Sequence, residues 1–311
     1  MNLVDQVTII IPPHERHSYL RRVLDFIKDE RVKIIIADSS SLPYPFLEEL
    51  KLRKNISYFH LPKLSFTSKI SKVIDKVNTP FVVLWAEDDF LNIKSLVKCT
   101  EFLQKNVDYH SCQGSYTRFI KKDDKYEFKH TYKISDNRDI NIDDQFERLA
   151  SFFKEYFQLF YAVHKTNNIR DLIMYAENKG IFNMFAIEIM IAYVAIARGK
   201  HRVLPIYFSS REVIATSVGF QKDNFEVFST SEKYKTQYQD MLQFLNKLEI
   251  GSTNAEKIIK IYFDQTWKNI DILRKIKLKL RYFLQPKLKH MDAEYNEFNS
   301  QILSSLLKNI K

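Results

Sequence analysis

The sequence predicts an α/β fold in which a mostly parallel sheet carries helices on both faces. Short apolar runs rich in β-branched residues alternate with segments of helical spacing over the first hundred residues. Such runs are typical of strands buried on both faces. Polar residues follow several of the runs directly, as expected where strands end in ligand-binding loops. The chain has 311 residues, of which 45% are hydrophobic, enough for one large domain with an extension.

Each element follows from a local pattern. Val7–Ile11 is a β-branched run stopped by Pro12-Pro13, which predicts a buried strand opening into a loop. The same reasoning predicts strands at 32–37, 56–59 and 80–85, and helical spacing predicts helices at 18–28, 66–77 and 93–103. Later segments predict strands within 109–132, at 157–164 and at 203–208, and a helix at 181–198 that Gly199 caps.

The chain divides into two regions by composition. Residues 1–228 carry the alternating strands and helices, and residues 229–311 are expected to be helical and basic. The start lacks the basic and apolar regions of a signal peptide, and no run is long enough to span a bilayer. The two cysteines, Cys99 and Cys112, have no metal-binding spacing, which favours a reducing compartment. We therefore expect a cytoplasmic protein.

The charge balance favours an anionic partner. Lys and Arg number 48 against 38 Asp and Glu, a formal net charge of +10. Nucleic acid, an acidic membrane surface and a phosphorylated substrate all fit this balance, as does a lysine-rich surface without a partner.

Polar side chains at three predicted strand ends should meet at one edge of the sheet. They are His14-Glu15-Arg16, Asp38 and Glu87-Asp88-Asp89. No glycine precedes Gly114, so a glycine-rich phosphate loop is absent. Clustered carboxylates can instead bind Mg²⁺ or Mn²⁺, which in turn binds phosphate. The alternative is an acidic turn that stabilises the start of the next helix.

Glu188 is the single acid of the apolar helix at 181–198. Apolar neighbours would partly desolvate its carboxylate and raise its pKa, which suits a general base. A solvated carboxylate, or one paired with a lysine, is the alternative.

Several segments together resemble the nucleotide-diphospho-sugar glycosyltransferases of the GT-A fold, close to family 2 and to a bacterial group within it. The segments are Thr8–Arg16, Ile35–Ser40, Asn78–Leu91, Tyr161–His164, Glu188 with Gly199-Lys200, Leu204-Pro205 and Arg211-Glu212. They lie within about the first 215 residues. Glu188 precedes Gly199 by eleven residues, the spacing of that family's catalytic carboxylate.

The resemblance implies roles for individual residues. Pro12, His14, Glu15 and Asp38 would hold the base and ribose of the donor, and Glu87-Asp88-Asp89 would be the DXD-type motif. We assign Asp89 to Mn²⁺ or Mg²⁺, with Asp88 close to the metal or the ribose. Pro13, Glu15 and Ile187 depart from the family pattern.

Three cations are candidates for stabilising a leaving diphosphate: Arg16, Lys69 and Arg211. A surface role for Lys69 and an ion pair between Arg211 and Glu212 are the alternatives. His164 is a further candidate metal ligand, with a structural histidine as the alternative.

The segment 267–289 is a basic amphipathic helix by spacing, a form that binds anionic membrane surfaces. It would bring the protein to the inner face of the plasma membrane, whereas packing on the domain or in a homo-oligomer is the alternative. No nucleic-acid-binding motif is present, so no nucleic-acid partner is expected.

The resemblance implies a metal-dependent, inverting glycosyltransferase. It would move a sugar from a nucleotide diphosphate donor, expected to be UDP-linked, to a hydroxyl of a cell-surface glycan or lipid-linked acceptor. A nucleotidyltransferase of similar fold and a non-catalytic scaffold protein remain alternatives.

Overall fold

The computed structural model describes residues 3–29, 31–122, 125–131, 138–214, 225–248, 255–264 and 293–308. A nine-stranded sheet runs through it in the order β3-β2-β1-β4-β8-β6-β9-β5, with β7 paired to β6. Its first four strands are parallel: β3 (Ile56–His60), β2 (Lys33–Asp38), β1 (Val7–Ile11) and β4 (Phe81–Leu84). Their carboxyl ends therefore meet at one edge.

The second half of the sheet mixes directions. Its strands are β5 (Phe90–Leu91), β6 (Tyr109–Lys122), β7 (Lys125–His130), β8 (Val163–Lys165) and β9 (Lys200–Glu212). The short strand β8 is antiparallel to both β4 and β6, and so joins the two halves. β6 and β9 run parallel. The last residues of β9 lie at the edge where β1, β2 and β4 end, because the Glu212 amide donates to Asp89 Oδ1.

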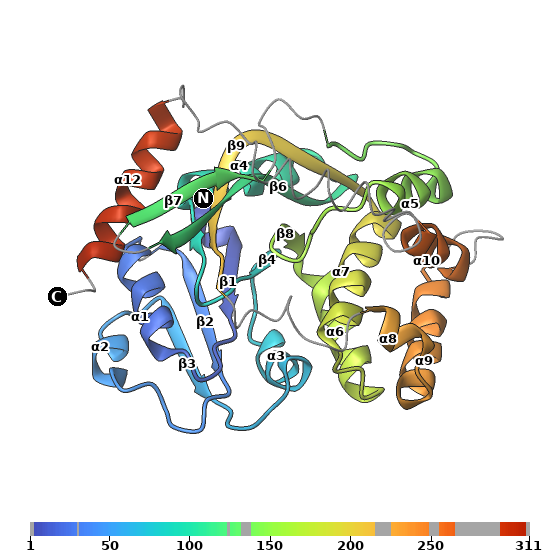
Figure 1. Ribbon diagram of the computed structural model, residues 1–311, viewed down its shortest axis with the longest axis horizontal. Coiled ribbons are helices and arrows are strands. Elements are labelled where there is room, and N and C mark those ends of the chain that lie inside the picture. The colour runs from blue at the N-terminus through green and yellow to red at the C-terminus, as the bar shows by residue number, and fades with distance from the viewer. Residues whose placement is uncertain are drawn as a thin grey trace.

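Helices cover both faces of the sheet (Figure 1). They are α1 (His17–Phe26), α2 (Leu47–Lys51), α3 (Phe66–Ile74), α4 (Ile93–Lys105), α5 (Gln145–Lys154), α6 (Thr166–Asn178) and α7 (Met184–Arg198). Alternate residues of β1 divide between two cores. Ile10 packs with α3, α6 and α7, while Ile9 and Ile11 pack with α1 and α4. This explains why the central strands are apolar at every position.

The region after residue 228 is helical where the structure describes it. The region contains η3 (Glu232–Tyr234), α9 (Lys235–Asn246), α10 (Ala255–Phe263) and α12 (Ala293–Lys308), and α8 (Phe225–Thr230) crosses its start. The short helix η1 (Leu3–Gln6) instead precedes β1. Figure 1 shows α9 and α10 beside α5 and α7, and α12 on the other side near α1 and β7. Phe244 and Ile258 share the core of α7. The boundary at 228 stays a prediction.

Two local predictions need correction. The strand expected at 157–164 is only Val163–Lys165, because the chain turns first: the Ala162 amide donates to the Leu159 carbonyl at 3.0 Å. Gly199 does end α7, but its φ of 180° is extended and not left-handed. A glycine is required there because a Cβ would lie 2.3 Å from His110 Cδ2.

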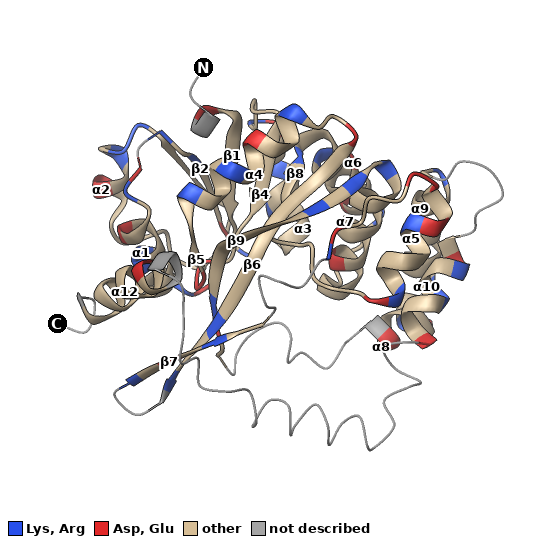
Figure 2. Ribbon diagram, turned by 90° about the horizontal axis from the view of Figure 1, so that it is seen from above, with Lys and Arg blue, Asp and Glu red and all other residues tan. Residues whose placement is uncertain are grey.

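The basic segment 267–289 lies outside the described residues, so its helix and any membrane contact stay predictions. Among the helices that the structure describes, none is long and apolar enough to cross a bilayer. Acidic and basic residues stand close together along the outer helices in Figure 2, so the net positive charge does not form a uniform surface in that view.

Candidate active site

The loops after β1 and β2 are tied to each other. His14 Nδ1 lies 3.1 Å from Ser39 Oγ, and the Glu15 amide donates to Ser40 Oγ at 2.8 Å. The Ser39 amide donates back to the Pro13 carbonyl at 3.1 Å. These contacts confirm that residues 12–16 and Asp38 converge at the edge of the sheet.

Glu15 serves the loop itself. Its φ of 55° is in the left-handed region, which is uncommon for a residue other than glycine. One carboxylate oxygen accepts from the Ser41 amide at 2.7 Å and from Ser41 Oγ at 2.6 Å. The hydrogen bond from the Ser41 side chain is the main reason that the pKa of Glu15 is lowered. The side chain that departs from the family pattern thus braces the loop.

Asp38 is fully buried at the end of β2 and accepts from three groups. The Ser40 amide donates to Oδ1 at 2.9 Å, while Tyr58 and His17 donate to Oδ2 at 2.7 and 2.8 Å. Burial would raise the pKa of Asp38, but the hydrogen bonds from Ser40, Tyr58 and His17 outweigh it and lower the pKa. Asp38 is therefore a fixed carboxylate.

Lys69 reaches the same loops from α3. Its ammonium donates to the carbonyls of Pro12 and Pro13 at 2.5 and 2.8 Å and to Ser39 Oγ at 3.1 Å. These contacts use all three N–H donors of a lysine. Burial lowers the pKa of Lys69 to about 8. In this structure Lys69 is buried and joins the strand ends, so the alternative of a surface lysine is wrong. Its role toward a diphosphate stays a prediction.

The acidic residues after β4 form a buried turn. The Trp85 amide donates to the Ile10 carbonyl at 2.8 Å, and Trp85 Nε1 donates to the Asp89 carbonyl at 2.9 Å. Arg16 Nη1 lies 2.9 Å from Asp88 Oδ2 and 3.6 Å from Glu87 Oε1. Arg16 therefore binds the acidic residues in this structure.

Asp89 is the most enclosed of the three acids. Its Oδ1 accepts from the Glu212 amide at 2.9 Å, which places the end of β9 against the turn. Glu212 itself forms an ion pair with Arg22 of α1, and Arg22 also donates to the Asp88 carbonyl at 3.0 Å. The alternative of an ion pair between Arg211 and Glu212 is therefore wrong, because adjacent residues of a strand point to opposite sides.

The pKa values of all three acids are raised. Burial is the main cause, and it raises the pKa of Glu87 to about 7. The charge of Asp88 raises the pKa of Asp89 further, while Arg211 opposes this change. Despite the nearby arginines, this cluster favours additional positive charge.

Glu188 faces the sheet from α7. Tyr156 donates its hydroxyl to Oε1 at 2.7 Å, and Gln158 Nε2 donates to Oε2 at 3.1 Å. Burial raises the pKa of Glu188, against the lowering effect of these two hydrogen bonds and of Arg211. The structure thus gives Glu188 the partly desolvated environment that its sequence predicted, and no lysine is among the partners identified for it.

Arg211 stands between the acidic turn and Glu188. Its guanidinium lies over the rings of Tyr116 and Tyr161, at 3.8 and 4.3 Å from their centroids, and it hydrogen-bonds Gln158 Oε1. Its charge acts on both Asp89 and Glu188. One arginine therefore joins the two sets of carboxylates into a single site.

The family model for glycosyl transferase family 2 matches residues 8–165, just over half of the chain. The chain belongs to this family. The match covers the two strand-end loops, the acidic turn and Gln158, whereas Glu188 and Arg211 lie beyond it. No curated protein matches the sequence.

Solved structures of S. aureus TarS are similar in fold. One TarS chain has a TM-score of 0.52 at 11% identity, covering 91% of this chain and 47% of that one. TarS 1-349 in complex with UDP-GlcNAc has a TM-score of 0.51 at 11% identity, covering 98% and 80%. This chain thus spans about half the length of the first TarS chain. Such low identity shows the fold alone, which is the predicted GT-A glycosyltransferase fold.

The acidic turn fits a divalent cation in this family 2 protein. Carboxylate oxygens are the ligands that Mg²⁺ and Mn²⁺ prefer, and Asp88 and Asp89 supply two carboxylates in adjacent positions after β4. Within the described residues, no group of three or more His, Cys, Asp or Glu side chains could hold a metal ion. Asp88 and Asp89 would therefore share the ion with phosphate oxygens and water, as is usual for Mg²⁺.

His164 lies in the sheet and not among the acids. It is fully buried, and its Nε2 is 2.8 Å from the Leu159 carbonyl, the contact that holds the turn before β8. Burial lowers its pKa to about 4. The structure supports the structural alternative for this residue.

Sequence reasoning missed several residues of the site, mainly those that contact its carboxylates. They are His17, Arg22, Tyr58, Tyr156 and Gln158. The pairing of Glu212 with Arg22 was also missed. Each is distant in sequence from the acid that it contacts, and none forms a motif with it. The match of the family model up to residue 165 is the only signal that included Gln158.

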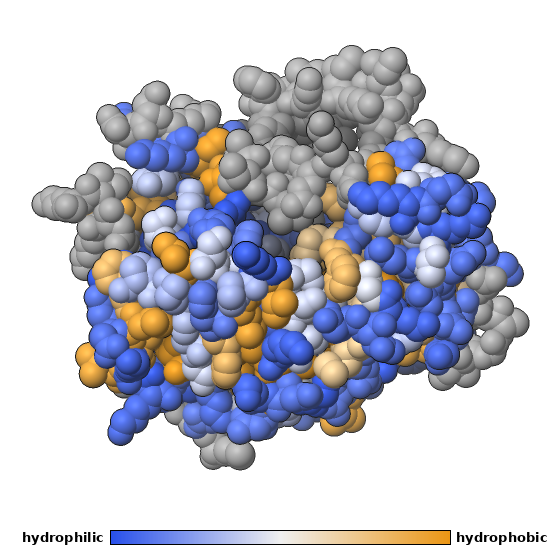
Figure 3. Space-filling model, turned by 90° about the horizontal axis from the view of Figure 1, so that it is seen from below, coloured by the Kyte–Doolittle hydropathy of each residue, from blue (hydrophilic) through white to orange (hydrophobic). Residues whose placement is uncertain are grey.

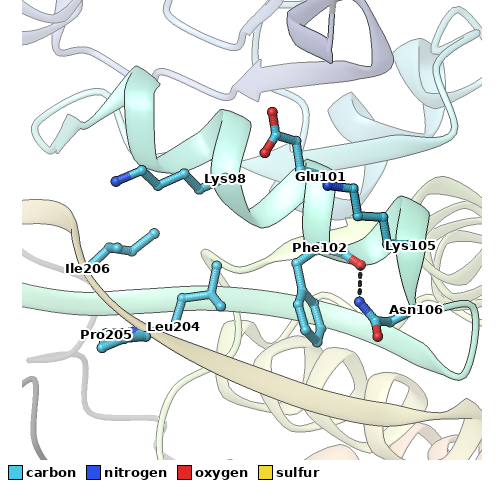
Figure 4. Close-up of a pocket in the computed structure, with 8 residues that line it drawn as sticks. All are labelled: Lys98, Glu101, Phe102, Lys105, Asn106, Leu204, Pro205 and Ile206. Carbon is cyan, nitrogen blue, oxygen red and sulfur yellow. Dashed lines mark hydrogen bonds between the residues drawn. The ribbon is translucent and has the colours of Figure 1, made fainter.

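A cavity of about 320 Å³ lies elsewhere, between α4 and β9 (Figure 4). Lys98, Glu101 and Lys105 of α4 surround a floor formed by Leu204, Pro205 and Ile206. None of its lining residues belongs to the site described above. On the face in Figure 3, hydrophobic residues lie in separate patches between hydrophilic ones, as is common on protein surfaces.

Proposed function

We propose that this protein transfers a sugar from a UDP-linked donor to a hydroxyl group, with inversion at the anomeric carbon and with Mn²⁺ or Mg²⁺. Membership of family 2 and the GT-A fold support glycosyl transfer. A structural neighbour crystallised with UDP-GlcNAc supports a nucleotide-sugar donor. The observation that carries the proposal is the hydrogen-bonded series from Arg211 through Gln158 to Glu188, in which the charge of Arg211 also acts on Asp89.

The strand-end loops would bind the nucleoside part of the donor. Asp38 is a carboxylate held in one orientation by three donors, and a fixed carboxylate is suited to accept hydrogen bonds from ribose hydroxyls. Pro12 and His14 would line the base. Asp88 and Asp89 would hold the divalent cation, which would neutralise the diphosphate when bound.

Glu188 would act on the other substrate. Its carboxylate accepts the proton of the acceptor hydroxyl as the oxygen attacks the anomeric carbon. A carbon–oxygen bond forms on one face while the bond to the diphosphate breaks on the opposite face, which inverts the configuration. Arg211 stabilises the negative charge that develops on the leaving diphosphate, and product release would return the proton to solvent.

The proposal names the acceptor only by its chemical class. A glycan or lipid-linked hydroxyl at the cytoplasmic face of the membrane is consistent with the basic segment 267–289, which lies outside the described residues. Liposomes with anionic lipid test that part separately, because binding should disappear when 267–289 is deleted.

The decisive experiment measures hydrolysis of a small panel of sugar nucleotides, including UDP-GlcNAc, with Mn²⁺, with Mg²⁺ and with EDTA. We expect one UDP-sugar to be hydrolysed slowly with metal, and no hydrolysis with EDTA. Turnover that EDTA does not change would contradict the metal requirement. No binding or hydrolysis of any sugar nucleotide, with a folded protein, would contradict the proposed function.

A further inference from the structure

Gln158 lies between the two charged groups that transfer requires. Its amide oxygen Oε1 accepts from Arg211 Nη1, and its amide nitrogen Nε2 donates to Glu188 Oε2 at 3.1 Å. It is a neutral side chain with a hydrogen bond at each end. The segment that carries it was expected to be a strand, and the turn that replaces the strand allows Tyr156 and Gln158 both to reach α7.

The arginine fixes which way the amide points. A guanidinium only donates hydrogen bonds, so the amide oxygen of Gln158 must face Arg211. The amide nitrogen, which only donates, is then left for Glu188. With Tyr156 donating to its other oxygen at 2.7 Å, Glu188 is held as an acceptor at both oxygens, which favours its ionised form.

Arg211 and the backbone of Gln158 are both held in place. Arg211 is buried and lies between the rings of Tyr116 and Tyr161. The backbone of Gln158 is also held, because Gln113 Nε2 donates to the Gln158 carbonyl at 3.4 Å. The position of Glu188 relative to Arg211 is therefore set by one amide group.

The other titratable groups that face Glu188 are one arginine and three tyrosines. Arg211 is the cation that acts on it. Tyr156 faces it from the turn, Tyr161 from the same segment and Tyr262 from α10. Burial is the main cause that raises the pKa values of Tyr161 and Tyr262. Burial also raises the pKa values of the acidic turn, so the test compares the acidic limb of the pH–rate profile between variants that leave this turn unchanged.

We propose that Gln158 is a positioning residue that keeps Glu188 in its base form and aligns it with Arg211. This inference rests on the proposed function. Inverting transfer places the attacking oxygen and the leaving diphosphate on opposite faces of the anomeric carbon, so the base and the cation must be held at a fixed separation. Gln158 spans that separation without adding charge to either group.

The test compares four variants with the wild type. Gln158→Met removes both hydrogen bonds at similar size, and Gln158→Glu keeps an acceptor for Arg211 but removes the donor to Glu188. Tyr156→Phe removes only the other donor to Glu188. Gln104→Met is the matched control, because Gln104 is exposed on α4. The measurements are kcat/KM against pH and the affinity for UDP with Mn²⁺ by calorimetry.

Each variant has its own expected result. Tyr156→Phe and both Gln158 variants should move the acidic limb upward by about 1 pH unit, because each loses a hydrogen bond to the carboxylate. Gln158→Met should also weaken UDP binding about fivefold, since Arg211 loses its anchor. Tyr156→Phe should bind UDP as the wild type does, and Gln104→Met should change neither quantity. Gln158→Glu should bind UDP more weakly, because its carboxylate neutralises the charge of Arg211.

Two outcomes would overturn the inference. The first is an unchanged acidic limb in folded Gln158→Met and Gln158→Glu, while the wild type is active. The second is equal UDP affinity of Gln158→Met and Tyr156→Phe, which would mean that Gln158 does not hold Arg211. A wild type that neither binds UDP nor hydrolyses any donor would instead remove the proposed function, and this inference with it.

Discussion

Two buried carboxylates at opposite sides of the site have opposite pKa shifts. Asp38, at the end of β2, accepts from a backbone amide, a phenol and a histidine, and its pKa is lowered. Glu188, on α7, accepts from a phenol and an amide, and burial raises its pKa. Desolvation is the largest single cause for both acids. The hydrogen bonds outweigh it at Asp38, whereas at Glu188 they do not.

The difference in pKa distinguishes a carboxylate that is suited to binding from one that is suited to proton transfer. A carboxylate with a lowered pKa stays ionised and holds its partners, as a residue that binds a ribose must. A carboxylate with a raised pKa takes up a proton readily, as a general base must. In the proposed function, the residues that bind the donor lie at the strand ends, and the proposed base lies on α7, a helix that faces them.

Replacing Glu188 by Gln should have the largest effect. The amide keeps the shape but cannot accept a proton, and a general base typically contributes a factor of about 10²–10⁴. We expect kcat to fall by about 10³ and UDP affinity with Mn²⁺ to stay the same. Initial rates of sugar transfer and calorimetry measure the two quantities.

Glu147→Gln on α5 is the matched control, because Glu147 is exposed. For the wild type, kcat/KM should decrease as pH falls through the raised pKa of Glu188, since the protonated form cannot act as a base. Near-normal turnover of Glu188→Gln would show that Glu188 is not the general base. The difference in pKa between Glu188 and Asp38 would then have no role in the reaction.

Asp89→Asn should separate activity from stability. Burial and the charge of Asp88 raise the pKa of Asp89, so its ionised form destabilises the fold above that pKa. Asparagine imitates the protonated acid and can still accept from the Glu212 amide. We expect activity to fall about 100-fold while the Tm rises by about 2 °C.

Differential scanning calorimetry with and without Mn²⁺ and UDP tests this expectation. The ligands should stabilise the wild type and Asp75→Asn, an exposed control, but not Asp89→Asn. A variant that Mn²⁺ and UDP stabilise as much as the wild type would place the cation elsewhere.

The fold was accessible from the sequence because its strongest signals are local. Val7–Ile11 and Phe81–Leu84 are buried on both faces, so their apolar runs and the breaks after them appear directly in the chain. Since parallel strands end at one edge, Asp38 and the acidic turn could also be expected to meet. The strand predicted at 157–164 failed because an apolar run does not reveal a turn within it.

The partners of the acids were not accessible in the same way. Arg22 was hidden as one more polar residue of α1, yet it pairs with Glu212, 190 positions later. Such a pair depends on side-chain direction at two distant elements, which periodicity does not encode. The acceptors of Lys69 could not be predicted for the same reason. The sequence placed Lys69 near the strand ends, but it did not show that carbonyls of the loop accept its hydrogen bonds.

Lys69→Met should therefore lower stability more than donor binding. The change removes the Lys69 donor from the Pro12 carbonyl and leaves the Pro13 carbonyl with the Ser39 amide, which costs about 2 kcal/mol in free energy of unfolding. Urea unfolding at pH 7 measures this, with exposed Lys72→Met on the same helix as the control. If Lys69 instead bound the diphosphate, UDP affinity would fall steeply while the stability of the variant matched that of Lys72→Met.

Tyr58→Phe should have the smallest effect and tests the Asp38 side of the comparison. The Tyr58 hydroxyl donates to Asp38 at 2.7 Å and accepts from the Tyr44 amide at 2.8 Å. Its loss should weaken UDP binding about threefold and cost about 1 kcal/mol of stability at pH 7. Because the pKa of Asp38 is lowered when folded, its stabilisation is present above its ordinary value of 3.8 and is lost as pH falls through the folded value.

Tyr175→Phe is the matched control. Its hydroxyl also contacts two partners, the Asp240 carbonyl at 2.9 Å and Gln243 Oε1 at 3.3 Å, but between α6 and α9. Both variants should lose similar stability, and only Tyr58→Phe should lose UDP affinity. Equal UDP affinities would mean that the fixed orientation of Asp38 serves the fold and not the donor. The contrast between the two carboxylates would then describe a structural acid and a base, and the ribose contact would have to be sought on the neighbouring loop at His14.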